Sequence, residues 1–503
     1  MKKQLLYLFS LSVLVFTWVR CQNPQQLDDR RKPNVIYIYA DDMGYGELGS
    51  YGQEKIKTPN LDRLAAEGIR FTQHYTSTPV CAPARCMLMT GRHGGHSYIR
   101  GNYPLGGGYD YLETGNMPLP EGTYTLGHLM QDAGYVTGAI GKWGLGTYGT
   151  TGEPKKQGFN YFYGFLGQRQ PHSHYPTHLR ENDGWDTLQN EFVRSGKLKP
   201  GAALAEFAKY EGKEYAGDKL TEKALNFIRD NREAPFFLYL PYTIPHAALQ
   251  VPHQSEAYKL YEGKWDTVAY YGHQGYAPHP QPRAAYAGMI TQLDNYVGQI
   301  MALVKELRLD ENTVIMFSSD NGTTFNGGVE AGFFNSVSGL RGLKMDVYEG
   351  GIRMPFIARW PGKIPAGKVS DLISVQYDMM ATFADLIQVE APKNDGVSLL
   401  PTLLGNDEKQ KQHEFLYFEY PEKRGQVAIR MGDWKGVKVD MKTNPDAKWE
   451  LYNLAADISE RTDVAAQHPG MVAELERIMM REHRVPHILQ WEFIDPRFKK
   501  FKQ

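Results

Sequence analysis

The chain has 503 residues, of which 42% are hydrophobic and 22% are charged. This composition supplies ample material for a packed core and excludes a disordered chain. The length predicts one large domain with at least one smaller unit. The formal net charge is −1 and no dense block of Lys and Arg occurs, so we expect no nucleic-acid partner.

Residues 1–21 have the pattern of a signal peptide. Lys2 and Lys3 precede the apolar run Leu5–Val19, which is short for a membrane span. Cys21 follows and would carry the lipid of a bacterial lipoprotein, although Arg20 is not the small residue that such cleavage sites prefer. We therefore expect an exported protein, in the periplasm or at the cell surface, with membrane contact only through a lipid at Cys21.

The other two cysteines are Cys81 and Cys86, and three cysteines are too few for a disulfide framework. A bridge between Cys81 and Cys86 would close a small loop and restrain little of the unfolded chain. The core is therefore expected to supply the stability.

Strand-like and helix-like segments alternate up to about residue 411, which is typical of a mostly parallel sheet with helices on both faces. The first strand is expected at Val35–Ala40, a run of β-branched and aromatic residues. Thr58 and Pro59 supply a cap and a first-turn proline for a helix that Gly68 ends. The next expected elements are helices from Thr125 to Gly134, at Asp218–Asp230 and at Arg283–Leu307, and strands at Tyr135–Ile140, Phe236–Leu240 and Thr313–Ser318.

After about Gln412 the segments become shorter. Strands are expected at Phe415–Tyr420 and Val427–Met431, followed by a helix near Met471–His483. The segments that are rich in Gly, His and Tyr, 101–115 and 261–282, are expected to be long loops, which often line the site of a compact enzyme.

Acidic side chains follow two of the expected strands. Asp41 and Asp42 come directly after Val35–Ala40, and Asp320 and Asn321 follow the strand near residue 318. Ligands of open α/β sheets bind beyond the carboxyl ends of strands, so the two groups are expected to converge. Such oxygen ligands suit Ca²⁺ or Mg²⁺ better than Zn²⁺. The alternative is turn chemistry, because Asp, Asn and Gly favour turns regardless of function.

The most specific motif surrounds Cys81. It reads Pro79-Val80-Cys81-Ala82-Pro83-Ala84-Arg85 and continues into Leu88-Met89-Thr90-Gly91-Arg92. A residue that begins a helix lies among free N–H groups, where an anion is favoured. Two other interpretations are a free cysteine that packs as a small hydrophobe and a thiol nucleophile, which needs a base that the motif does not supply.

The motif resembles the signature of the type I sulfatases, C-x-P-x-R with a downstream T-G-R, in which the cysteine is oxidised to formylglycine (3-oxoalanine). Ala84 stands where serine is common, a variation that this family tolerates. The similarity runs from about Lys32 to Tyr452. It includes, in the family's order, Ala40-Asp41-Asp42-Met43-Gly44, Gly141-Lys142-Trp143, Pro245-His246, Ser319-Asp320-Asn321-Gly322, Gly339-Leu340-Arg341-Gly342-Leu343-Lys344 and Tyr348-Glu349-Gly350-Gly351-Ile352-Arg353.

The resemblance implies an alkaline-phosphatase-like α/β fold over residues 32–411, with a large, mostly parallel sheet between helices and a smaller C-terminal α+β subdomain over residues 412–503. It also implies one Ca²⁺, and a maturase that generates formylglycine as a partner. The implied ligands of the ion are Asp41, Asp42, Asp320 and Asn321, with the converted Cys81 against it.

In the family's scheme, one hydroxyl of the hydrated formylglycine attacks sulfur, and the other then collapses to the aldehyde and expels sulfate. The resemblance implies that Lys142 and Lys344 hold the transferring group and that Arg85 steadies the formylglycine. It also makes His246 the acid for the leaving oxygen. Singly, a lysine is usually a solvated surface charge and a Pro-His pair usually has no role, so these assignments depend on the ordered series.

One departure from the family concerns Gly144. The family often has Lys-x-His where this chain has Lys142-Trp143-Gly144, so the usual histidine is absent. The segment 168–175 offers two histidines that face the same way if it is extended, and we favour His172 as the replacement that binds substrate. The alternative is two ordinary loop histidines. Gly144 and the Gln-x-x-x-His stretch also resemble sulfatases that act on 4-sulfated galactose or N-acetylgalactosamine in glycans.

Two other functions remain open at this point. A phosphatase or phosphodiesterase of the same superfamily would use Thr or Ser with two zinc ions, which the Cys81 motif and the oxygen ligands disfavour. A non-catalytic protein that binds sulfated glycans is the other, because the usual histidine is missing. The sequence thus predicts an arylsulfatase-like glycan sulfatase whose substrate is a sulfated carbohydrate.

Overall fold

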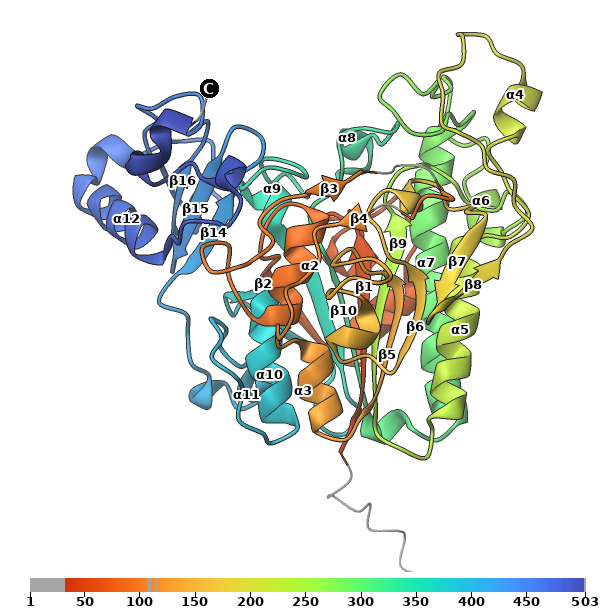
Figure 1. Ribbon diagram of the computed structural model, residues 1–503, viewed down its shortest axis with the longest axis horizontal. Coiled ribbons are helices and arrows are strands. Elements are labelled where there is room, and N and C mark those ends of the chain that lie inside the picture. Colours follow the sequence, from red (N-terminus) through yellow and green to blue (C-terminus); the bar gives the residue numbers. More distant parts are fainter. Residues whose placement is uncertain (1–31, 107–109, 114, 502–503) are drawn as a thin grey trace, which may run out of the picture.

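The computed structural model describes residues 32–106, 110–113 and 115–501 (Figure 1). The expected signal peptide over residues 1–21 and the candidate lipid site at Cys21 lie outside these described residues. Within the described ranges, no helix combines the length and the apolar character that crossing a bilayer requires.

A sheet of 11 strands forms the centre of the large domain, and it is mostly parallel, as predicted (Figure 1). β1 (Asn34–Asp41) lies between β10 (Thr313–Ser319) and β9 (Phe236–Pro245) and runs parallel to both. The order across the sheet is β12-β2-β11-β10-β1-β9-β5-β6-β7-β8, with β13 beside β2. The other strands are β2 (Ile69–Tyr75), β5 (Val136–Lys142), β6 (Tyr161–Phe165), β7 (His178–Glu181), β8 (Gly184–Thr187), β11 (Arg353–Arg359), β12 (Lys368–Ser370) and β13 (Ser374–Val375).

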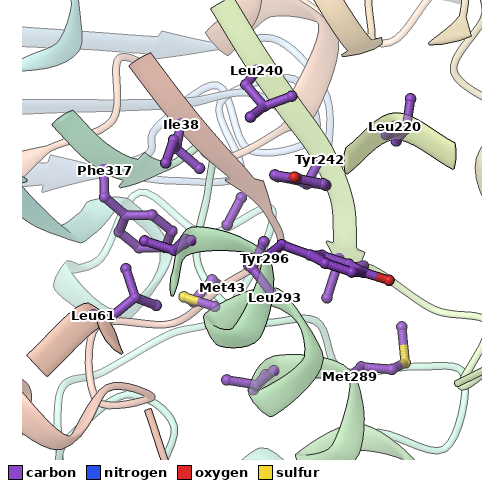
Figure 2. Close-up of a cluster of buried hydrophobic side chains, with 14 of the residues drawn as sticks. Ile38, Met43, Leu61, Leu220, Leu240, Tyr242, Met289, Leu293, Tyr296 and Phe317 are labelled. Carbon is purple, nitrogen blue, oxygen red and sulfur yellow. The ribbon is translucent and has the colours of Figure 1, made fainter. Parts of the chain in front are cut away.

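Helices cover both faces of this sheet because its central strands carry apolar residues on both faces. In β1, Ile36 and Ile38 join one core and Tyr37 and Tyr39 join the other. α1 (Pro59–Ala66), α5 (Ala216–Asp230) and α7 (Pro282–Glu306) cover the first face. Figure 2 shows Leu61, Leu220 and Leu293 of these helices in the same cluster as Ile38 and Phe317. α2 (Cys81–Thr90), α3 (Leu126–Asp132) and α10 (Met379–Leu386) cover the second.

The expected elements of the large domain are present with shifted ends. β9 continues past the expected end at Leu240 to Pro245, which brings His246 to the edge where β1 and β10 end. Thr58 occupies the N-cap position of α1 and Pro59 lies in its first turn, as expected, but the Thr58 hydroxyl donates to Asp62 (3.2 Å) and makes no cap hydrogen bond. The free N–H groups of Asn60 and Leu61 instead donate to Asp294 of α7 (3.1 and 2.7 Å).

The two expected loops contain little regular structure. Within the described residues, segment 101–115 holds only β3 (Pro104–Leu105) and the start of β4 (Gly115–Asn116), and 261–281 holds no helix and no named strand. The remaining short helices are α4 (Leu204–Ala208), α6 (Glu256–Lys259), α8 (Ala331–Phe334), α9 (Glu349–Ile352) and α11 (Leu400–Leu403).

The C-terminal region forms a smaller α+β subdomain, as predicted, at the blue end of the ribbon in Figure 1. One face of its four-stranded antiparallel sheet packs under α12 through Leu475 and Ile478. The opposite face carries Phe418 and Tyr420, which share a cluster with Cys81. The subdomain therefore covers the beginning of α2. Its elements are β14 (Leu416–Tyr420), β15 (Gln426–Met431), β16 (Trp434–Lys438), β17 (Glu450–Asn453) and α12 (Pro469–Glu482).

The end of α12 is held by a histidine between two carboxylates. His483 contacts Glu419 of β14 through Nδ1 (3.0 Å) and Glu492 through Nε2 (2.9 Å). Burial alone would lower the pKa of His483, but the two carboxylates outweigh it and raise the pKa to about 9.

We predict that this contact makes stability depend on pH. The folded-state pKa of His483 lies above its ordinary value of about 6.5, so its contribution is complete below about pH 6.5 and is lost as the pH rises through about 9. Urea unfolding should show a loss on the order of 2 kcal/mol over this window. His483→Gln should remove that loss, whereas His468→Gln, whose ring packs on Trp434, should keep it. If the free energy of unfolding fell equally with pH in both variants, His483 would not be the group responsible.

Candidate active site

Four oxygen-bearing side chains meet where β1 and β10 end. The parallel register pairs Ala40 with Ser319, so the residues that follow, Asp41 and Asp42 on one strand and Asp320 and Asn321 on the other, are neighbours. The backbone N–H of Asp42 donates to Asp320 Oδ1 (3.1 Å), and Asn321 Nδ2 donates to Asp42 Oδ1 (2.7 Å). The expected convergence of the two motifs is therefore present.

Two oxygens of this group fit a hard cation. Asp41 Oδ1 and Asn321 Oδ1 are buried and have no hydrogen-bond partner among the residues that the structure describes. A buried polar atom without a partner is costly, and oxygen atoms of this kind are the ligands that Ca²⁺ and Mg²⁺ prefer. Ligand-type atoms of Asp41, Asp42, Cys81 and His246 also lie within 4.8 Å of one another. The donor set thus suits one divalent cation in contact with residue 81.

Three buried cations balance the three carboxylates. Lys142 Nζ lies 2.7 Å from Asp41 Oδ2, and Lys344 Nζ lies 2.6 Å from Asp42 Oδ1. Arg85 Nη2 lies 2.7 Å from Asp320 Oδ2. All six side chains are buried. Because their formal charges sum to zero, a divalent cation would leave the site positive and attractive to an anionic substrate.

Because the three carboxylates are crowded together, their pKa values are shifted in different directions. Burial favours the neutral acid, but the charges of Lys142 and Arg85 outweigh it and hold the pKa of Asp41 well below its ordinary value. Burial, with repulsion from Asp41, raises the pKa of Asp320 to about 7 despite Arg85. Burial likewise raises the pKa of Asp42, although Lys344 opposes it. A further positive charge would relieve this repulsion.

Cys81 is the first residue of α2 and is 2% exposed. The N–H of the next residue, Ala82, donates to Asn102 Oδ1 (3.1 Å). Burial raises the pKa of the Cys81 thiol to about 12, and the nearby Lys142 and Lys344 only partly oppose this. The thiol is therefore protonated at neutral pH, which argues against a thiolate nucleophile.

The rings of His246, His172 and Tyr276 contact one another beside the acids. His246 Nε2 lies 3.6 Å from Asp42 Oδ2, while its Nδ1 donates to the carbonyl oxygen of Ala247. The half-buried His172 stacks on His246 with ring centroids 5.1 Å apart. Tyr276, on the expected loop 261–282, lies edge-on to His246 at 5.7 Å. Burial and the charge of Lys344 hold the pKa of His246 well below its ordinary value, so the free site holds a neutral imidazole.

The space where the family's histidine would begin is taken by Gln168. Gly144 has φ +80°, and a Cβ atom there would overlap the side-chain amide nitrogen of Gln168. His172, the replacement favoured from the sequence, lies against His246 and Tyr276, and its role in substrate binding stays a prediction. Neither Tyr276 nor Gln168 was predicted from the sequence as a site residue, although Gln168 is the first residue of the Gln-x-x-x-His stretch noted there.

A second group of metal-type side chains lies at the junction with α12. His93, His96 and Glu482 have ligand-type atoms within 4.8 Å of one another. However, the N–H of Gly95 donates to His93 Nδ1 (3.1 Å), so Nε2 keeps the proton and donates to Glu482 (3.3 Å). The rings of His93 and His96 stack 4.0 Å apart, whereas a shared ion must lie in the plane of each ring. This group is a hydrogen-bonded contact between the two domains.

A parallel sheet with acids at adjacent strand ends, buried cations and a helix N-terminus defines a hydrolase of anionic esters. The sulfatase family model matches residues 33–389, and a model of the C-terminal region of N-sulphoglucosamine sulphohydrolase matches residues 343–484. The chain belongs to the sulfatase family, and as such it is a sulfuric ester hydrolase.

Several relatives are similar over most of the chain. An N-acetylgalactosamine-6-O-sulfatase of Bacteroides thetaiotaomicron is 31% identical and covers 91% of this chain and 95% of the relative. Arylsulfatase A of Bos taurus is 34% identical over 80% of this chain and 74% of its own. The solved structure of Ps i-CgsB in complex with a neocarrahexaose is 28% identical, with a TM-score of 0.74, and covers 94% of this chain and 100% of that chain.

We predict that Ca²⁺ stabilises the folded chain through the strand-end acids. At about 100 times its Kd, the ion should add about 2.7 kcal/mol to the free energy of unfolding and raise the thermal midpoint. Asp41→Asn, which removes a carboxylate with an unpartnered oxygen, should abolish this shift. Glu482→Gln, in the second group, should retain it. If Asp41→Asn kept the shift and Glu482→Gln lost it, the ion would bind at the group of His93, His96 and Glu482 and the prediction would be wrong.

Proposed function

We propose that this enzyme removes a sulfate ester from galactose or N-acetylgalactosamine in a glycan, with Cys81 converted to formylglycine and one Ca²⁺ bound beside it. The observation that carries the proposal is the position of Cys81. It lies at the first turn of α2, within 4.8 Å of ligand atoms of Asp41, Asp42 and His246, with a thiol that stays protonated. An unmodified thiol there is a poor nucleophile, so the chemistry needs a different side chain.

Asp41, Asp42, Asp320 and Asn321 would hold the ion, which when bound supplies a Lewis acid for the sulfate oxygens. The unpartnered oxygens of Asp41 and Asn321 support this role. The ammonium groups of Lys142 and Lys344 contact oxygens of the same carboxylates. Lys344 contacts both oxygens of Asp42, so a bound ion would compete with it there, and a displaced ammonium would be available to an anionic substrate.

The hydrated aldehyde at position 81 would supply a hydroxyl that attacks sulfur and a second hydroxyl whose deprotonation releases sulfate and restores the aldehyde. Arg85, one turn further along α2, donates to the carbonyl oxygen of Lys142 (2.6 Å) and to Asp320, so its guanidinium is fixed and steadies residue 81. Because Cys81 is buried in the folded chain, the maturase must act before the fold closes.

Lys142 and Lys344 bind the sulfate group that is transferred, since both are buried cations whose charges act on residue 81 and lower the pKa of its thiol. His246 gives a proton to the leaving sugar oxygen. Its Nδ1 donates to Ala247, so the unprotonated Nε2 faces the acids. This nitrogen would accept the proton that the attacking hydroxyl loses and pass it to the leaving oxygen. His172 and Tyr276, which contact the His246 ring, would bind the sugar on the leaving-group side.

The substrate class is supported by relatives whose names contain N-acetylgalactosamine-6-sulfatase and by a solved relative in complex with a neocarrahexaose. The Gly144 pattern favours the 4-sulfate ester, so assays with the 4- and 6-sulfated sugars decide the position. Export through the segment 1–21 is part of the same proposal, because polymeric glycans are met outside the cell.

We predict that Cys81→Ala abolishes sulfate release while Cys86→Ala preserves it. The two cysteines are five residues apart in one helix and both are buried, but Cys86 contacts Ser97 and lies in the core. When the chain is produced with a formylglycine maturase and assayed with Ca²⁺, Cys81→Ala should lower kcat by at least about 10⁴-fold. Mass spectrometry of the peptide with residue 81 should show the aldehyde in the wild type. Full turnover with an unmodified thiol would refute the mechanism.

A further inference from the structure

We propose that Gln168 binds hydroxyl groups of the sugar next to the scissile sulfate and thereby selects carbohydrate sulfates over other sulfate esters. This inference rests on the proposed function and names a residue that selects the substrate. The chain departs from its family at Gly144, and two atoms of the neighbouring Gln168 have no partner among the described residues.

The side chain of Gln168 has its place because Gly144 has no Cβ atom. Gly144 continues the pairing of β5 and β6, since its N–H donates to the carbonyl oxygen of Leu166 (2.9 Å). Its φ of +80° is a conformation that favours glycine, and any side chain there would collide with the amide of Gln168. Gly144 and Gln168 therefore form a matched pair in which one residue makes room for the other.

Both partners of this pair are joined to site residues. Lys142, two residues before Gly144, pairs with Asp41, whereas the intervening Trp143 turns into the core against Phe159. His172, four residues after Gln168, stacks on His246. The main-chain N–H of Gln168 donates to the buried Asn116 (2.9 Å), which fixes the base of its side chain. The Gln168 amide thus packs on Gly144, and short stretches of chain connect this pair to Lys142 on one side and to His172 on the other.

The amide is buried without a partner in the described residues. Gln168 is 7% exposed, and neither its Nε2 nor its Oε1 makes a hydrogen bond. Gln170, two residues later on the same segment, is equally buried, but its Nε2 donates to Asp110 (3.0 Å) and to the carbonyl oxygen of His178 (3.2 Å). Burial in this segment therefore does not itself prevent pairing. A buried donor and acceptor that are left free are expected to meet a ligand.

The chemistry of the two free atoms identifies the ligand group. A sulfate monoester offers only acceptor oxygens at neutral pH, so it would satisfy Nε2 and leave Oε1 unpaired. Under the proposed function, the sulfate already has Lys142 and Lys344 as donors. A sugar hydroxyl both donates and accepts, and two adjacent hydroxyls would satisfy the whole carboxamide at once. A site built to hydrogen-bond a hydroxyl discriminates strongly against analogues that lack it.

The test compares two substrates that share the sulfate but differ in hydroxyl groups. The sulfated monosaccharide carries hydroxyls, whereas 4-nitrophenyl sulfate carries none. With matured, Ca²⁺-loaded enzyme, Gln168→Ala should lower kcat/KM for the sugar sulfate roughly 10- to 100-fold and change that for the aryl sulfate by less than about 3-fold. Gln168→Glu, which keeps an acceptor and loses the donor, should show the same selectivity. Gln131→Ala, on α3, is the matched control and should change neither.

A sugar analogue that lacks the hydroxyl next to the sulfate gives the reciprocal measurement. The wild type should lose activity on this analogue, and Gln168→Ala should lose little more, because the two changes remove the same hydrogen bonds. Equal losses on the sugar and aryl substrates would overturn the proposal, since the amide would then act on the sulfate or the leaving oxygen. Unchanged activity on both would also overturn it, because the amide would then be satisfied by water.

Binding separates this inference from the proposed function. In a Cys81→Ala background no turnover is needed, and adding Gln168→Ala should raise the Kd for the sugar sulfate roughly 10-fold or more while leaving the Kd for inorganic sulfate within about 2-fold. If the wild type hydrolyses neither substrate, the proposed function fails, but this binding difference still supports the role of Gln168. Equal weakening for both ligands would contradict it.

Discussion

The structure depends on a charge balance between three buried carboxylates and three buried cations at the ends of neighbouring strands. Asp41, Asp42 and Asp320 could not lie together at this depth without Lys142, Lys344 and Arg85, because an unpaired buried charge costs far more than a folded chain can sustain. Buried ion pairs of this kind add little net stability. Their presence is therefore best explained by chemistry, in which a divalent cation and an anionic ester enter a site that is already assembled.

The fold supplies this arrangement through long-range pairing. The parallel register of β1 and β10 sets the two acidic motifs side by side, and the extension of β9 to Pro245 carries His246 to the same edge. The C-terminal subdomain closes the other side, since Tyr420 and Phe418 of its sheet share a cluster with Cys81. A single small residue, Gly144, then leaves room for the Gln168 amide, which we propose binds the sugar.

The local patterns in the sequence predict much of this, and the reason is physical. Buried parallel strands are continuous apolar runs in the sequence. β1, β10 and the acids that follow them can therefore be recognised from the sequence alone. The Cys81 motif is similarly local. Contacts between segments that are distant in the sequence leave no such local pattern. Examples are the hydrogen bonds from α1 to Asp294, the edge contact of Tyr276 with His246 and the packing of the Gln168 amide on Gly144. Such contacts depend on the tertiary structure and cannot be predicted from either segment alone. His172 was predicted as a site residue from its neighbours, but its stacking on His246 was not.

The most direct test is a crystal structure of the enzyme produced with a formylglycine maturase and grown with Ca²⁺, with anomalous scattering used to locate the ion. We expect one ion at about 2.3–2.6 Å from oxygens of Asp41, Asp42, Asp320 and Asn321, with a hydrated aldehyde at residue 81 facing it. An unmodified thiol at residue 81, together with an ion bound elsewhere, such as beside His93 and Glu482, would contradict the account.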